Sequence, residues 1–374
     1  MSDQETLNMM ALARLSYFHL AAMRQLLGEL GSATAIIEHR NNIRDIVPEC
    51  STKLIEGLKS LDDAMKRAET EFEYARAHDI QMLCFGDADY PQRLAECDDA
   101  PLILFYKGTA NLNMQRIICI IGTRRCTIQG QDLIRRFMAD LRAMCPEVLV
   151  VSGIAYGVDI NAHRRALENG YPTVAVLAHG LDYLYPAYHK ATARQMIQQG
   201  GLLTEFFTQT NADKMNFVRR NRIVAGLSDA CILVESAAKG GGLITARLSR
   251  DYNRDVFAFP GRPGDHYSEG CNNLIRDNVA SLINNAEDFV NAMRWNDDAA
   301  LARQRAKGIE RQLFPNLSEE ETAVVNVLKN DNDQNINFLL VRTNMPINRL
   351  TAVLFELEMK GIIMAMAGGV YHLL

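Results

Sequence analysis

The segment from 212 to 224, ADKMNFVRRNRIV, concentrates positive charge beside an aromatic ring. Within nine residues it holds Lys214, Phe217, Arg219, Arg220 and Arg222. Such a mixture suits unpaired nucleic acid, because cations meet phosphates while a ring stacks on a base without reading sequence. We predict a helix over 216–226, with Arg219 and Arg222 on one side and Phe217 and Arg220 on another. On pattern alone, core packing is an equally good interpretation of Phe217.

Three glycine-bearing segments at strand ends offer a second kind of phosphate contact. They contain Gly122, Gly153 and the triplet Gly240, Gly241 and Gly242. Glycine lets phosphate oxygens approach main-chain amides, and the helix that follows points its positive end at the same place. A plain strand-to-helix turn explains each glycine equally well. The strict GxGxxG of dinucleotide-binding proteins is absent.

Two arginines follow the first glycine turn directly. Arg124 and Arg125 come after Gly122 and Thr123, so at least one guanidinium is expected over the strand end, with Arg124 as first choice. The complete set of predicted DNA-binding residues is Gly122, Thr123, Arg124, Arg125, Gly153, Lys214, Phe217, Arg219, Arg220, Asn221, Arg222, Lys239, Gly240, Gly241, Gly242 and Thr245.

Signals for catalysis are weaker. Asp159 and His163 stand four residues apart on a predicted helix, and Glu205 and Glu235 follow strands. A lone Asp and His on a helix are more often a cap and a packing contact than an acid–base pair. No serine or cysteine sits in a GxSxG context, and no Cys and His cluster has metal-ligand spacing. We expect no enzymatic activity, no cofactor and no metal.

Composition sets the frame for this site. The chain has 374 residues, a net charge of −5 and a pI near 5.9, so nucleic acid must be met by a local basic face. Eight cysteines lack a CxxC pair, and we interpret them as reduced core residues. Neither a signal peptide nor an apolar run of about 18 residues is present, which predicts a cytoplasmic protein without membrane contact.

The elements that must position the site fall into four parts. Residues 1–78 show helical periodicity and predict a small helical domain. Residues 79–296 alternate apolar strands with amphipathic helices, which predicts an α/β domain whose parallel sheet is covered on both faces. A polar linker, 297–316, leads to 317–374, where helices and a hairpin turning at Gly368 and Gly369 predict a winged helix. Ser318 and Glu321 predict a capping box at its first helix.

Several blocks, taken in order, resemble one known family. IIGTRRCTIQG, VVSGIAYGVDINAHRRAL, GLDYLYP, FVRRNRIVAGLSDACILVES, GGGLITARLS, VFAFPG and GCNNLIRDN are similar to successive blocks of the DNA-processing protein A (DprA/Smf) family over about residues 80–295. The resemblance implies an extended Rossmann-like domain that dimerises, binds single-stranded DNA and loads RecA recombinase during natural transformation. It also implies that Arg124, Lys214 and Phe217 line the DNA pocket.

This chain departs from the family pattern in three places. Thr123 replaces the usual serine of the glycine-serine-arginine turn, and Gly240, Gly241 and Gly242 replace the serine-glycine before LITA. The N-terminal part has SYFHLAAM where many members carry a glycine-centred hairpin, so no DNA contact is expected from it.

Two other functions remain open from the residues. GGGLIT resembles the phosphate loop of nucleotide phosphoribohydrolases, but the glutamate of that family is missing because Ala246, Arg247 and Leu248 follow Thr245. A ligand-sensing transcription regulator with a winged helix is the other alternative, although the C-terminal segment carries few cations. Phe257, Phe259 and Tyr267 form a candidate dimer surface, for which core packing is an equal explanation.

Overall fold

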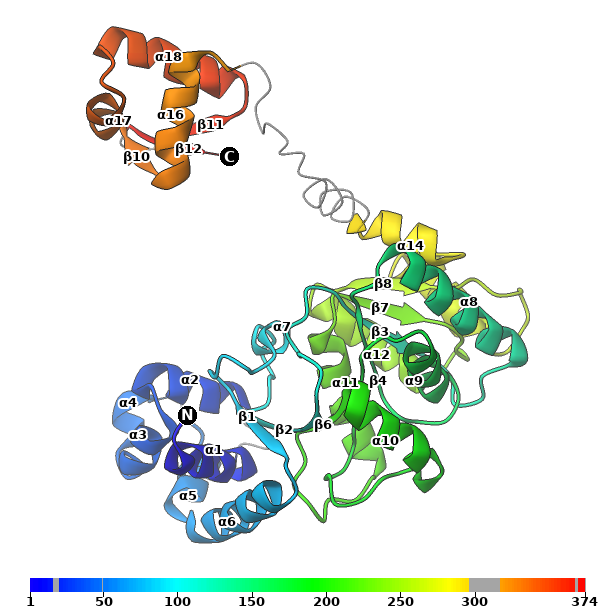
Figure 1. The fold of residues 1–374 in the computed structure, drawn as a ribbon. Coiled ribbons are helices and arrows are strands. Elements are labelled where there is room, and N and C mark those ends of the chain that lie inside the picture. The colour runs from blue at the N-terminus through cyan, green and yellow to red at the C-terminus, as the bar shows by residue number, and fades with distance from the viewer. Residues whose placement is uncertain (16–19, 49, 296–316, 367–368, 374) are drawn as a thin grey trace. The chain divides into compact units, whose positions relative to one another are not determined.

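The computed structural model describes residues 1–15, 20–48, 50–295, 317–366 and 369–373 (Figure 1). The chain forms two compact units, Met1–Asn296 and Asp297–Leu374. The predicted linker 297–316 and the predicted turn residue Gly368 lie outside the described residues, as does part of SYFHLAAM.

The first unit begins with short helices around an apolar core. They are α1 (Asp3–Leu15), α2 (Leu20–Leu30), α3 (Ala33–Glu38), α4 (Ile43–Ile46), α5 (Thr52–Lys59) and α6 (Asp62–Ala77). Helix α2 ends before Gly31, whose φ of +79° favours glycine. The core of these helices, with Leu12 and Leu58 fully buried, continues into Ile103 and Phe105 of the adjoining sheet. The helices therefore share their core with the α/β part.

A nine-stranded sheet follows. Its strands are β1 (Gln81–Cys84), β2 (Ile103–Gly108), β3 (Ile117–Ile121), β4 (Leu149–Ser152), β5 (Thr173–Val176), β6 (Gly201–Thr204), β7 (Ala230–Leu233), β8 (Asp255–Ala258) and β9 (Ser281–Leu282). The spatial order is β1-β2-β6-β5-β4-β3-β7-β8-β9. The strands from β3 to β9 in the chain run parallel to one another. At one edge of the sheet, β2 pairs antiparallel with β6 and β1 pairs antiparallel with β2. The predicted α/β fold with a parallel sheet is confirmed.

Helices cover both faces of this sheet. They are α7 (Gln92–Ala95), α8 (Ile128–Met144), α9 (Val158–Glu168), α10 (Lys190–Gln199), α11 (Lys214–Leu227), α12 (Gly241–Asp251), α13 (Glu269–Arg276) and α14 (Ala286–Ala292). Successive residues of β3 enter different cores: Cys119 packs with residues of α11 and α12, and Ile120 with residues of α8, α9 and α14. Burial on both faces explains why the strands are apolar throughout.

Two sequence predictions about core residues have different outcomes. All eight cysteines are free thiols, and seven are buried, with Cys126 half-buried. The candidate dimer surface is wrong for Phe257 and Phe259, which are buried against Phe137 and Phe289. Both rings are apolar because they belong to the core, Phe257 within β8 and Phe259 directly after it.

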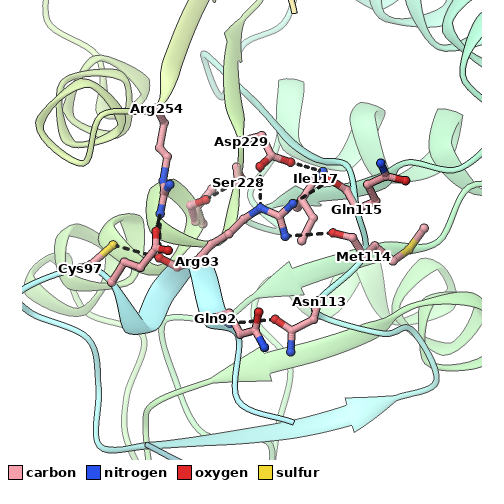
Figure 2. A network of polar contacts seen from close by, with 12 residues as sticks. Gln92, Arg93, Cys97, Asn113, Met114, Gln115, Ile117, Ser228, Asp229 and Arg254 are labelled. Atoms are coloured by element: carbon pink, nitrogen blue, oxygen red, sulfur yellow. Dashed lines mark hydrogen bonds and ion pairs between the residues drawn. The ribbon is translucent and has the colours of Figure 1, made fainter. Parts of the chain in front are cut away.

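An ionic network holds the α7 segment against the amino ends of two central strands (Figure 2). Arg93 Nε lies 2.6 Å from Asp229 Oδ1, and its other nitrogens donate to the Met114 and Gln115 carbonyls. The second Asp229 oxygen accepts the Ile117 amide at 2.8 Å. The network thus lies at the start of β3 and β7 and leaves their carboxyl ends open.

The second unit contains α16 (Glu319–Asn330), β10 (Gln334–Asn335), α17 (Ile336–Thr343), α18 (Ile347–Met359), β11 (Ile363–Met366) and β12 (Val370–Leu373). Its strands form an antiparallel sheet in the order β10-β12-β11. The capping box of Ser318 and Glu321 is confirmed. Helices followed by a hairpin agree with a winged helix, and that assignment stays a prediction.

Candidate nucleic-acid interface

The site lies where the connections of the parallel sheet change direction. From β3 the chain proceeds through β4, β5 and β6 on one side, and β7, β8 and β9 lie on the other. Loops after β3 and β7 therefore diverge at their carboxyl ends, which is where open α/β sheets bind ligands. A hollow of about 1060 Å³ opens at this point.

Fourteen of the sixteen predicted DNA-binding residues line this one hollow. They are Gly122, Thr123, Arg124, Arg125, Gly153, Lys214, Phe217, Arg220, Asn221, Lys239, Gly240, Gly241, Gly242 and Thr245. They come from three strand-end loops and two helices, so the fold gathers segments that are up to about 120 residues apart in the chain.

The turn after β3 is clamped by its neighbours. The Thr123 amide donates to the Glu235 carbonyl at 2.7 Å, and the Val158 amide donates to the Thr123 carbonyl at 3.1 Å. A Cβ at Gly122 would lie 2.6 Å from Val158 Cγ2, which no side chain can occupy without displacement. The clamp fixes the position from which Arg124 leaves the main chain.

Helix α11 supplies the aromatic wall. The Asp213 carboxylate accepts the Asn216 amide at 2.8 Å and caps the helix, which leaves Lys214 exposed in the first turn. Phe217 is half-buried and lines the hollow. The Arg124 guanidinium lies 4.9 Å from the centre of its ring, as a cation–π contact.

Arg220 lines the hollow, but its positive charge is buried and is not exposed to solvent. It is buried, and its guanidinium donates to the Val176 carbonyl beside the Asp159 carboxylate. Burial lowers the pKa of Arg220, and burial raises the pKa of Asp159, while each charge favours the ionised form of the other. The absence of a Cβ at Gly153 makes room for both, because such an atom would lie 2.2 Å from Asp159 Oδ2 and 2.4 Å from Arg220.

Arg219 and Arg222 do not line the hollow, so the structure does not bring these two predicted DNA contacts together with the other fourteen. Both extend to the other side of α11, where Arg222 pairs with buried Glu205 and Arg219 lies 3.5 Å from the same carboxylate. Arg222 also donates to the Asp99 carbonyl at 2.6 Å. The predicted division of the helix into two sides is confirmed, but charge alone did not tell which side met the hollow.

The carboxylates and the histidine considered for catalysis have structural partners. Glu235 accepts the Thr127 amide and hydroxyl at the start of α8. His163 is fully buried, and its Nε2 donates to the Gly153 carbonyl at 2.7 Å while Nδ1 lies 2.7 Å from the Thr173 hydroxyl oxygen. Burial lowers the pKa of His163 to about 4, so the ring is neutral.

Sequence reasoning missed other residues of the hollow. Ser236, Arg247 and Tyr267 line it, as does Asp159. Arg247 was detectable: it lies on the helix that follows the glycine triplet, three residues after exposed Ile244, and so shares a side with it. Tyr267, a candidate for a dimer surface with core packing as an equal explanation, lines the hollow because its loop reaches it in the folded chain.

Exposed cations line the hollow. Five of its cations are exposed, and none of them pairs with an acid in the part of the chain that the structure describes: Arg124, Arg125, Lys214, Lys239 and Arg247. Together with main-chain turns after β3 and β7, they suit an extended anion with several negative charges.

Among the described residues, no helix is long and apolar enough to cross a membrane.

Comparison with known proteins agrees with this architecture. The family model for DNA recombination-mediator protein A matches residues 81–294. DNA processing protein DprA of Streptococcus pneumoniae is 37% identical over 204 residues, which are 54% of this chain and 71% of that protein. Protein Smf of Escherichia coli is 31% identical over 292 residues, 76% of this chain and 75% of that protein.

Solved structures are similar as well. The X-ray structure of DprA from Streptococcus pneumoniae has a TM-score of 0.63 at 30% identity and covers 77% of this chain and 97% of that one. A structure of DNA processing protein A from Helicobacter pylori, described for its single-stranded DNA binding mode, has a TM-score of 0.52 at 29% identity and covers 58% of this chain and 96% of that one. By fold, site and sequence, the chain belongs to the DNA recombination-mediator protein A family.

Proposed function

We propose that the chain binds single-stranded DNA in the hollow and acts as a recombination mediator without catalysing a reaction. The observation that carries the proposal is that five exposed cations line the same hollow as half-buried Phe217, whose ring Arg124 contacts. Cations that follow a sugar-phosphate chain and a ring that stacks on a base are the two components of sequence-independent single-strand binding.

A single strand fits this site better than a duplex. The Phe217 side chain lines the hollow, and a base that stacks on its ring there must be unpaired. The family relative from Helicobacter pylori, with its described single-stranded DNA binding mode, supports the same reading. The acidic net charge of −5 confines binding to this local basic site.

The cellular role proposed here rests on the family. We infer that the chain protects incoming single strands in the cytoplasm during natural transformation, works as a homodimer, and loads RecA recombinase onto the bound strand. Support comes from the matched family, whose description is that of a recombination mediator. Reconstituted RecA filament formation on oligothymidine, with and without this protein, tests the loading step.

Oligothymidine binding by fluorescence anisotropy tests the site. Phe217→Ala removes one stacked base, worth about 1–3 kcal/mol, and should weaken single-strand binding with little effect on duplex binding. Lys214→Ala should weaken both. Arg250→Ala is the matched control, because Arg250 is an exposed cation on α12 outside the hollow. Wild-type affinity in Phe217→Ala and Lys214→Ala would exclude the hollow as the binding site.

A second measurement addresses catalysis. Incubation with nucleoside monophosphates should leave them intact, because Asp159 is held by Arg220 and no glutamate follows Thr245. Release of free base, lost in Asp159→Asn, would favour a phosphoribohydrolase instead.

A further inference from the structure

Three exposed tyrosines lie on the loops beside the hollow. Tyr156 follows β4, and Tyr185 and Tyr188 belong to the loop between β5 and α10. Their exposed fractions are 48%, 46% and 79%. Large aromatic side chains that gather at the surface often mark a site where another molecule binds.

Ring contacts join Tyr185 to the hollow, and a second group of ring contacts joins Tyr188 and Tyr156 through His189. The Tyr185 ring lies 6.2 Å from Phe217 in an edge-to-face arrangement. Three residues on, Tyr188 lies 6.0 Å from His189, and Tyr156 contacts the same imidazole at 4.9 Å. His189 is buried and its Nδ1 donates to the Ile154 carbonyl at 2.7 Å, so it links the two loops.

The loop that carries Tyr185 is held in place before any ligand binds. The Tyr185 amide donates to His179 Nε2 at 3.1 Å, and His179 Nδ1 donates to the Gly180 carbonyl at 2.7 Å. One nitrogen accepts and the other donates, which requires a neutral ring. Burial lowers the pKa of His179 and keeps it in that form. A fixed platform loses little entropy when a base stacks on it.

Positive charge accompanies the rings. Lys190 follows His189 directly, and Arg164 on α9 lies near enough to lower the pKa of His189 together with burial. Both cations are exposed, and neither is paired with an acid within the described ranges. Aromatic faces interleaved with free cations reproduce the composition of the hollow on the neighbouring surface.

We propose that Tyr185, Tyr188 and Tyr156 form a tyrosine track on which the bases of a single strand stack as it leaves the hollow. The inference rests on the proposed function, since the track receives the strand from Phe217. The tyrosyl hydroxyls of Tyr156 and Tyr188 have no hydrogen-bond partner among the residues described, so the rings act through their faces. The track extends the binding site without adding sequence preference.

A length series of labelled oligothymidines, from about 4 to about 16 nucleotides, tests the track. Wild-type affinity should rise with length. The double variant Tyr156→Ala with Tyr188→Ala should bind the shortest strand normally and the longest at least about fivefold more weakly, the low end for one stacked base. The double variant to Phe should match wild type, because it keeps the rings.

The outcomes separate the track from the hollow. Wild-type affinity of the alanine variant at every length overturns the track, and Lys214→Ala then still reports on the hollow. Loss at long lengths in the alanine variant while Lys214→Ala binds normally overturns the hollow, and with it a track that receives its strand from the hollow. Equal loss in the alanine and phenylalanine variants overturns stacking.

A spectroscopic variant gives an independent readout. In Tyr188→Trp, the emission above the background of buried Trp295 should be quenched by the longest strand and not by the shortest. Unchanged emission with bound long strand would overturn the track.

Discussion

Arg222→Ala and Arg124→Ala should have opposite consequences, although both remove one arginine from the neighbourhood of the hollow. The Arg222 and Glu205 side chains are only 8% and 7% exposed, and they form an ion pair. Removing one partner of a buried pair costs about 3–5 kcal/mol, because the other charge stays buried. Arg219 remains 3.5 Å from Glu205, so we expect the lower end, about 3 kcal/mol.

Arg124 is exposed and has no acidic partner among the described residues. Its removal should change stability by less than about 0.5 kcal/mol. Its effect should appear in the salt dependence of binding. If all five exposed cations of the hollow contact phosphates, the slope of log K against log salt is about −3.5 for a single strand, and about −2.8 after Arg124→Ala. Arg222→Ala should leave the slope unchanged in the folded protein.

Urea unfolding followed by Trp295 fluorescence measures the first consequence. Trp295 is the single tryptophan of the chain, is 8% exposed and contacts Phe289 at 5.2 Å, so its emission reports the first unit. Arg222→Met combined with Glu205→Leu should recover part of the lost stability, since neither charge of this buried pair is then left without the other. Oligothymidine anisotropy between about 50 and 200 mM salt measures the second consequence.

Arg222 and Arg124 could instead show each other's expected behaviour, which would contradict both expectations. An unfolding midpoint unchanged in Arg222→Ala, with a smaller salt slope, would place Arg222 on the DNA. A lowered midpoint in Arg124→Ala without any change in slope would remove the hollow from the binding site.

Three further outcomes are expected. Gly153→Ala should destabilise the first unit by about 1–3 kcal/mol through overpacking against Asp159 and Arg220, whereas Gly241→Ala, with open space around its Cβ position, should be near neutral in the same urea assay. The pKa of His163 is about 4 in the folded protein and 6.5 in the unfolded chain, so the free energy of unfolding should fall by on the order of 3 kcal/mol as pH drops from 6.5 toward 4. Urea midpoints measured across this pH range should depend less on pH in His163→Gln than in the wild type. Deletion of 317–374 should leave oligothymidine affinity within about twofold, since the hollow lies wholly in the first unit, and a larger loss would show that the C-terminal unit contacts the strand.

Much of the α/β part was predictable because its signals are local. Fully apolar strands such as 117–121 and 230–233 have no polar face and must lie in a doubly covered sheet. Glycine turns after them, and the capped helix over 214–227, could be recognised for the same reason. The place of β1 and β2 at the edge of this sheet was not predictable, since β1 pairs only with β2, and β2 pairs antiparallel with β6, about 100 positions away.

The amino-acid sequence alone determined which residues carry chemistry: a cluster of cations with one ring, glycines after apolar strands, and helical spacing that separates Arg219 and Arg222 from Phe217 and Arg220. The tertiary structure decided which charges are available. Glu205, which directly follows β6 and lies outside the helix, pairs with one side of α11, and exposed Lys214 lies at the hollow. Burial and pairing are properties of packed neighbours, so no local pattern contains them.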